Sequence, residues 1–260
     1  MGKRFANSPP YIMIKAVLFD LGDTIFNYGR FNSSKVFEDG AKASFELLRL
    51  YNGGRSPCPY VWYWFSHSVS IRLHYIISHF TLKEFDCPRI LRRKAWRLGV
   101  TLGEKQLLHL SAKWYEPLRE AAVVEPDIKE SMLRLKNELG LKLGIISNTF
   151  IPGKVLEDHL DAFGLTELFD ARIYSCDTIC RKPDMRIYEK TLVALGVKGC
   201  ETVMVGDRMK EDVIGPARLG IQGVIKLGDT NLHKRYPSNL KKIRYISELP
   251  ELLKKQNDNC

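Results

Sequence analysis

Short apolar runs alternate with helix-length amphipathic stretches along this chain, and this alternation constrains the fold more than any other feature. The apolar runs cover residues 14–19, 141–146, 171–174, 202–205 and 223–227. Runs of this length and composition are typical of strands that are buried on both faces of a sheet. Helical periodicity fills the stretches between the later runs, at about 127–139, 153–163, 184–195 and 211–219. The alternation predicts an α/β fold with a doubly wound parallel sheet.

A long segment, residues 28–125, interrupts this alternation after the first apolar run. It contains no convincing buried strand, but it does contain helical patterns at roughly 33–50, 60–78, 84–98 and 104–119. We therefore expect two units. Residues 11–27 and 126–260 would form the α/β core, and residues 28–125 would form a helical domain inserted into it. A chain of 260 residues is long enough for both.

Chemically useful side chains follow several of the predicted strands. Asp20 comes directly after the first apolar run, Ser147 after the second and Asp207 shortly after the fourth, while Lys182 precedes a helical pattern. Ligands of open parallel sheets bind beyond the carboxyl ends of the strands, so we expect these groups to share one site. A carboxylate there can attack phosphorus and form an aspartyl phosphate, while a hydroxyl and an ammonium group hold the phosphoryl oxygens.

The same site is expected to need a divalent cation. The negative charge of Asp20 would repel a phosphate dianion unless a cation lay between them. Mg²⁺ prefers carboxylate, carbonyl and water oxygens, and Asp20 and Asp207 can supply such ligands. The pattern therefore predicts a magnesium site.

Four short motifs in this order resemble those of the haloacid dehalogenase-like (HAD) hydrolase superfamily. They are Asp20-Leu21-Gly22-Asp23-Thr24, Ser147-Asn148, Lys182-Pro183, and Gly206-Asp207 with Asp212 a little further on. Each motif is weak alone, but all four in order, over nearly the whole chain, are specific. The resemblance implies a Rossmann-like HAD core, and it makes the helical insertion a type 1 cap domain.

The resemblance also implies roles for the metal-binding residues. Asp20 would be the nucleophile and a Mg²⁺ ligand, and the backbone carbonyl of Gly22 would be a second ligand. Asp207 would bind the metal directly, and Asp212 would support the metal or its waters.

On the phosphate side, the resemblance assigns three residues. Ser147 and Lys182 would hold the phosphoryl group, and Lys182 would also orient Asp20. Asn148 is expected beside them in the substrate-binding part of the site, where it helps to shape it.

One position departs from the family's phosphatase pattern. Those enzymes usually carry a second Asp, as general acid and base, two residues after the nucleophile, but this chain has Gly22 there. A first interpretation is a working phosphatase whose acid/base is Asp23, or whose leaving group needs little protonation. A second is a 2-haloacid dehalogenase-type hydrolase, against which Asp207 and Asp212 stand. A third is a catalytically impaired phosphate-binding or regulatory module.

We favour the first interpretation, in which the chain is a Mg²⁺-dependent phosphatase that hydrolyses a small phosphorylated metabolite through an aspartyl phosphate on Asp20. The formal charge of +10 then indicates attraction of small anions or solubility, because no zinc-finger spacing or RNA-binding motif accompanies it. No apolar run approaches the roughly 20 residues that cross a bilayer. The six cysteines contain no Cys-x-x-Cys pair and are too sparse for a disulfide scaffold. Reduced thiols, and therefore a cytoplasmic protein, are expected. The sequence does not indicate whether the protein is a monomer or an oligomer.

Two features of the insertion could contribute to specificity. The aromatic cluster at residues 60–65 cannot all lie on one side of a helix, and we expect it to pack mostly inside the insertion. Arg89, Arg93 and Arg97 recur at a spacing of four, which favours a solvated basic face. The alternative for both features is a position facing the substrate.

Overall fold

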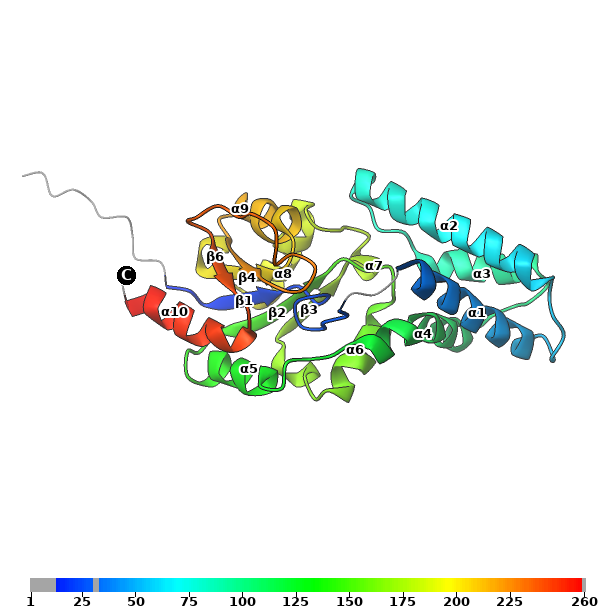
Figure 1. Ribbon diagram of the computed structural model, residues 1–260, viewed down its shortest axis with the longest axis horizontal. Coiled ribbons are helices and arrows are strands. Elements are labelled where there is room, and N and C mark those ends of the chain that lie inside the picture. The colour runs from blue at the N-terminus through cyan, green and yellow to red at the C-terminus, as the bar shows by residue number, and fades with distance from the viewer. Residues whose placement is uncertain (1–12, 30–32, 259–260) are drawn as a thin grey trace, which may run out of the picture.

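A computed structural model describes residues 13–29 and 33–258 of the chain (Figure 1). The first two residues of the predicted core segment 11–27, positions 30–32 of the predicted insertion and the last two residues of the chain therefore lie outside the described part.

The centre of the molecule is a six-stranded, wholly parallel sheet with the strand order β3-β2-β1-β4-β5-β6. The strands are β1 (Ala16–Phe19), β2 (Lys142–Ser147), β3 (Ala171–Tyr174), β4 (Thr202–Gly206), β5 (Gln222–Lys226) and β6 (Lys241–Ile243). The chain proceeds outward from β1 in both directions, which confirms the predicted doubly wound α/β fold. The edge strand β6 was not predicted, because its residues Lys241-Lys242-Ile243 include only one apolar side chain.

Helices cover both faces of this sheet (Figure 1). One face carries α5 (Ile128–Asn137), α6 (Gly153–Ala162) and α10 (Leu249–Asp258), and the other carries α8 (Met185–Leu195) and α9 (Gly215–Ala217). Shorter turns are η1 (Thr166–Leu168), α7 (Ser175–Thr178), η2 (Gly199–Glu201) and η4 (Ile246–Glu248). The helix expected at 211–219 is instead a π-helical turn, η3 (Met209–Ile214), followed by α9.

The segment between β1 and α5 is helical in its described residues. Its helices are α1 (Ser33–Tyr51), α2 (Tyr60–Thr81), α3 (Cys87–Arg97) and α4 (Glu104–Ala121), and they lie beyond one end of the sheet (Figure 1). They enclose an apolar cluster of their own, built around Leu48, Ile71, Leu91 and Leu110. At its base the buried Trp114 Nε1 donates a hydrogen bond of 3.0 Å to Nε2 of the fully buried His67.

The aromatic cluster at the start of α2 does not pack as we expected. Only Tyr63 is buried, while Trp62 is 71% exposed and Phe65 58% exposed. Helical geometry explains this result, because residues 62, 65 and 69 share the side of α2 that points away from α1 and α3. None of the described helices combines the length and the apolarity that a membrane span requires.

Short backbone contacts join the helical insertion to the sheet domain next to Lys182. The segment after α2 pairs with the segment before Lys182: Lys83 and Cys180 form an antiparallel bridge, and Glu84 N–H donates to the carbonyl of Ile179. In return, Arg181 N–H donates to the carbonyl of Leu82. The insertion therefore contacts the core within three residues of a predicted site residue.

Candidate active site

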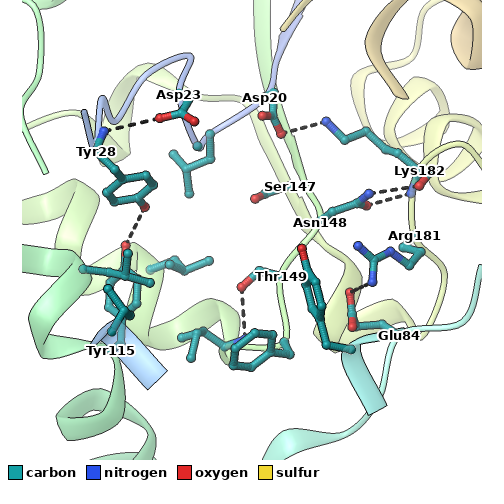
Figure 2. Close-up of a pocket in the computed structure, with 18 of the residues that line it drawn as sticks. Asp20, Asp23, Tyr28, Glu84, Tyr115, Ser147, Asn148, Thr149, Arg181 and Lys182 are labelled. Atoms are coloured by element: carbon teal, nitrogen blue, oxygen red, sulfur yellow. Dashed lines mark hydrogen bonds and ion pairs between the residues drawn. The ribbon is translucent and has the colours of Figure 1, made fainter. Parts of the chain in front are cut away.

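The central strands bring the predicted nucleophile and its neighbours to one end of the sheet. In β1, Phe19 is in register with Ile145 of β2 and with Val205 of β4. Asp20 therefore emerges between the two neighbouring strands, and its backbone N–H donates to the carbonyl of Val205. Ser147 ends β2 and Asp207 follows β4, so both lie at the same edge. Figure 2 shows Asp20, Ser147 and Lys182 around one space.

Lys182 forms the electrostatic centre of this group. Its ammonium lies 2.7 Å from Oδ1 of Asp20 and 2.6 Å from Oδ1 of Asp212, and its side chain is only 2% exposed. Burial disfavours the charged form of the ammonium, but the two carboxylates outweigh that effect, and the pKa of Lys182 is raised above its ordinary value. The lysine is therefore charged, and it orients Asp20 while balancing the charge of Asp212.

A cluster of three carboxylates surrounds this ammonium. One oxygen from each of Asp20, Asp207 and Asp212 lies within 4.8 Å of the others, and this is the one group of its kind among the described residues. Burial, together with the charges of Asp20 and Asp212, raises the pKa of Asp207 to about 7. Asp207 Oδ1 is buried, accepts no hydrogen bond from the described residues, and lies 3.9 Å from Arg208 Nε. Crowded acidic oxygens of this kind fit a hard divalent cation such as Mg²⁺.

Asp212 is held against the sheet by a close approach that only glycine permits. A Cβ at Gly206 would lie 2.2 Å from the carboxyl carbon of Asp212. With Lys182 on one oxygen, the other oxygen of Asp212 accepts the N–H of Arg208 at 2.9 Å. Burial raises the pKa of Asp212 to about 6, although Lys182 acts in the opposite direction.

Asn148 acts on Lys182 through the backbone. Its amide donates to the carbonyl of Lys182 at 2.9 Å and accepts the N–H of Lys182 at 2.7 Å (Figure 2). Both ends of the Asn148 amide therefore position Lys182. This arrangement favours a positioning role over direct contact with substrate.

Two groups of site residues were not predicted. The first is Asn231, which is buried and whose amide donates to the carbonyls of Asp207 and Lys226 at 3.0 and 2.9 Å. It ties the loop after β4 to the loop after β5. An isolated Asn in a polar loop carries no periodic or motif signal, so only the fold reveals it.

The second group is a buried polar network between the insertion and the core. Ser175 Oγ donates to Glu84 at 2.7 Å and accepts the N–H of Thr149 at 2.7 Å. Arg181 lies 3.5 Å from the same Glu84 carboxylate and hydrogen-bonds Ser78 of α2. The network connects the loop after β2 with the segment that precedes Lys182. Glu84 and Arg181 are far apart in the sequence, and no pattern in the sequence indicates that they pair in the fold.

The position of the missing acid/base is partly filled by an aromatic ring. A Cβ on Gly22 would lie 3.4 Å from Cε2 of Tyr28, which is ordinary contact distance. Tyr28 and Tyr115 share a 3.0 Å hydrogen bond between their hydroxyls (Figure 2). The Tyr115 hydroxyl lies 3.0 Å from Nδ1 of the buried His159. Burial raises the pKa of Tyr115 to about 12 and lowers that of His159 to about 4. These three hydrogen-bonded side chains are therefore uncharged near pH 7.

Asp23 stands beside this ring at the edge of the site. Its backbone is in the left-handed region, with φ of 55°, and one carboxylate oxygen accepts the N–H of Tyr28 at 3.4 Å. Burial raises the pKa of Asp23 above its ordinary value, and the nearby charge of Asp20 acts in the same direction. A carboxyl with a raised pKa near Asp20 can donate a proton more readily than an exposed one.

A cavity of about 560 Å³ opens above these groups, between the sheet domain and the insertion. Its floor includes Asp20, Ser147 and Lys182. Its walls come mainly from the insertion and from the loop after β2, and they include Tyr28, Phe37, Tyr75, Trp114, Tyr115 and Phe150. The residues at 60–65 and the exposed Arg89, Arg93 and Arg97 do not line it.

Fold and site together define an α/β protein with a parallel sheet and a carboxylate-rich site at one end of it. The family described as haloacid dehalogenase-like hydrolase matches residues 14–220 of this chain. The chain belongs to that family, which confirms the resemblance seen in the four motifs.

Similarity to individual known proteins covers nearly the whole chain. A glyceraldehyde 3-phosphate phosphatase of Pyrococcus furiosus is 34% identical over 245 residues, which cover 92% of each chain. The protein of the same name from Methanothermobacter thermautotrophicus is 30% identical over 102 residues, but that match spans only 43% of its length. The 2-haloacid dehalogenase of Pseudomonas syringae pv. Tomato DC3000 shares the fold, with a TM-score of 0.60 at 21% identity over 94% of this chain and 100% of that one.

Proposed function

We propose that this hydrolase is a Mg²⁺-dependent phosphatase that acts on a small phosphorylated metabolite through an aspartyl phosphate on Asp20. The observation that carries the proposal is the convergence of Asp20, Asp207 and Asp212 within 4.8 Å, with the Lys182 ammonium on two of them. Such a site can hold both a cation and a phosphoryl group. The relatives named as glyceraldehyde 3-phosphate phosphatases support a phosphate monoester as substrate.

Each residue of the site would have a distinct task in the reaction. Asp20, Asp207 and the carbonyl of Gly22 would hold Mg²⁺, with Asp212 supporting its waters, and the bound cation would neutralise phosphoryl charge. The free Asp20 oxygen would attack phosphorus, and the bond from phosphorus to the ester oxygen would break with its electron pair on that oxygen. Ser147 and Lys182 would hold the phosphoryl oxygens during this transfer. Water would then attack phosphorus and release Asp20.

Asp23 is our proposed acid/base in place of the residue missing at Gly22. Its raised pKa suits a group that donates a proton to the departing alcohol and later accepts one from water. The alternative dehalogenase chemistry is not supported by a specific observation, because a nucleophile that attacks carbon has no use for Asp207 and Asp212 beside it.

The helical insertion, residues 28–125, would serve as the cap domain. Its helices α1, α2 and α4 supply residues to the cavity wall, so it is placed to select the leaving group. We also propose that the enzyme works in the cytoplasm, in keeping with the five described cysteines, which are all unpaired.

Hydrolysis of 4-nitrophenyl phosphate by the purified full chain tests the proposal. We expect turnover that requires Mg²⁺, is abolished by a chelator and is lost in Asp20→Asn, which keeps the shape of the side chain. The matched control is Glu189→Gln, which neutralises an exposed carboxylate outside the site and should leave turnover unchanged. Full activity of Asp20→Asn, or activity indifferent to Mg²⁺, would show that the proposed chemistry is wrong.

A further inference from the structure

The cavity above Asp20 has a continuous aromatic wall. Phe150 is its centre, and its ring centroid lies 5.0 Å from that of Trp114 of α4 and 6.4 Å from that of Phe37 of α1. Tyr75 of α2 adds a fourth ring, 6.5 Å from Phe150. All four residues line the cavity, and Phe37, Tyr75 and Phe150 are only half-buried. Part of the surface of these three rings is therefore not covered by the protein. The guanidinium groups of Arg72 and Arg181, which line the same cavity, lie 5.7 and 5.9 Å from the ring centroids of Phe37 and Tyr75.

The wall begins directly beside the phosphate-binding residues. Phe150 follows Ser147 by three positions in the loop after β2, and the Ser175 hydroxyl holds that loop by accepting the N–H of Thr149. A phosphoryl group on Ser147 and Lys182 would thus direct its ester oxygen toward the space that Phe150 borders. The wall is placed to contact the leaving group.

The size of the cavity exceeds what a three-carbon leaving group can fill. A volume of about 560 Å³ lies in the range of sites that bury drug-sized ligands. A small polar alcohol would leave much of the aromatic surface facing water. A planar, bulky apolar group would cover it, and stacked or edge-to-face ring contacts would orient that group.

Gly22 points independently to the same class of leaving group. A phenolic oxygen departs as a stabilised aryl oxide, which needs less proton donation than an alkoxide does. When Asp20 attacks phosphorus, the electron pair of the breaking bond would rest on that aryl oxygen, and Asp23, one position away from the usual acid, could protonate it afterwards. A site without the usual acid at position 22 is therefore best matched to aryl esters.

From the aromatic wall and from Gly22 we propose that the preferred substrates are phosphate monoesters of bulky aromatic alcohols. The inference rests on the proposed phosphatase function and narrows it to a substrate class. This substrate class differs from the glyceraldehyde 3-phosphate that the names of the relatives give. It is inferred from residues of this chain's own insertion and of its loop after β2.

The first experiment compares kcat/KM for 1-naphthyl phosphate, phenyl phosphate and glyceraldehyde 3-phosphate with Mg²⁺. The two aryl esters have leaving groups of similar acidity, so their ratio reports recognition by the wall. We expect 1-naphthyl phosphate to be preferred over phenyl phosphate by about 10-fold or more, the effect of a modest gain in apolar contact. The triose phosphate should be the poorest substrate.

Variants of the aromatic wall test whether it causes the preference for 1-naphthyl phosphate over phenyl phosphate. Phe150→Leu and, in case that protein does not fold, Phe37→Leu should each reduce the naphthyl-to-phenyl ratio by about 5-fold or more while phenyl phosphate is still hydrolysed. Phe65→Leu, on the exposed side of α2, is the matched control and should keep the ratio of the parent.

Gly22→Asp tests the second observation. Restoring a carboxyl at this position should raise the rate with glyceraldehyde 3-phosphate more than the rate with 1-naphthyl phosphate, because only the alkoxide gains from an acid. Absence of Mg²⁺-dependent hydrolysis of every ester would overturn the proposed function itself. Efficient hydrolysis with a preference for glyceraldehyde 3-phosphate, or a naphthyl-to-phenyl ratio unaffected in a folded wall variant, would leave the phosphatase intact and overturn the aromatic substrate class.

Discussion

At the scale of single residues, Lys182 decides whether three buried carboxylates can coexist. Asp20 and Asp212 both lie within 2.7 Å of its ammonium, and Asp207 is close enough to both carboxylates for their charges to raise its pKa. Without a cation at this point, the buried carboxylates would repel one another, and Asp20 would lose the group that orients it.

Lys182→Met should therefore lower kcat by about 10²–10³, the usual effect of removing one group that stabilises charge in the transition state. A steady-state assay against Lys190→Met, which removes an exposed lysine, separates this effect from a general loss of positive charge. A Lys182→Met enzyme with the kcat of the parent would show that the ammonium is not needed.

The amino-acid sequence was sufficient to find residues with a motif, and insufficient for those without one. Asp20, Ser147, Lys182, Asp207 and Asp212 were singled out as candidates because each follows a strand or precedes a helix in a recognisable order, and the structure brings them to one end of the sheet. Asn231 and Glu84 were missed, because their roles depend on which loops meet in space.

At the scale of elements, the contact between the insertion and the core rests on few groups. Glu84, in the segment between α2 and α3, is 5% exposed and holds both Ser175 and Arg181. Removing one partner of a buried ion pair leaves the other charge uncompensated.

Glu84→Ala should lower the free energy of unfolding by about 3–5 kcal/mol, because Arg181 remains buried and unpaired by its carboxylate. Urea unfolding followed by circular dichroism measures this. The double variant Glu84→Ala, Arg181→Met should recover part of the loss, and a double variant less stable than Glu84→Ala would contradict the explanation.

The contact between Tyr115 of α4 and His159 of α6 should contribute to stability in a pH-dependent way. His159 of α6 is 1% exposed, and burial lowers its pKa to about 4, below the value near 6.5 of an unfolded chain. Its neutral form is therefore favoured by folding, and that contribution is present above pH 6.5 and lost as the pH falls toward 4.

His159→Gln keeps a polar partner for Tyr115 but cannot bind this proton. We expect the stability advantage of the parent at pH 7 to shrink by about 1.4 kcal/mol per pH unit between pH 6.5 and 4. Urea unfolding of both proteins at several pH values tests this, and a constant difference across that window would contradict the burial of a neutral imidazole.

Elements also show where sequence patterns stop being informative. Helix α2 was expected from its apolar periodicity, and it forms, but its aromatic start is largely exposed rather than packed. Periodicity predicts that a helix exists, whereas the side that becomes buried depends on where α1, α3 and α4 lie. The aromatic wall of the cavity accordingly comes from dispersed residues of α1, α2 and α4 and from Phe150.

At the scale of the whole molecule, the proposed cation would link the two halves of the sheet. Asp20 follows β1 and Asp207 follows β4, so metal binding should stabilise the folded chain by mass action. The pKa of Asp207 is raised to about 7, which means that its folded state holds a proton that an unfolded Asp has lost above pH 4. This carboxyl therefore costs the metal-free protein stability as the pH rises from about 4 through 7.

The increase in Tm on adding Mg²⁺ should consequently grow between pH 6 and pH 8, because the cation must displace that proton at the lower pH. Thermal unfolding with and without Mg²⁺ measures it, and a chelator should reverse the increase. In Asp207→Asn both the increase and its pH dependence should be lost, and retention of either would place the cation elsewhere.

The covalent step on Asp20 is the central claim, and trapping it tests the claim most directly. Borohydride added during turnover of an aryl phosphate with Mg²⁺ reduces an aspartyl phosphate to homoserine, which peptide mass spectrometry can locate. The account predicts homoserine at position 20, dependent on both substrate and Mg²⁺ and absent from Asp20→Asn. Release of phosphate with Asp20 unmodified throughout, or homoserine at another aspartate, would contradict it.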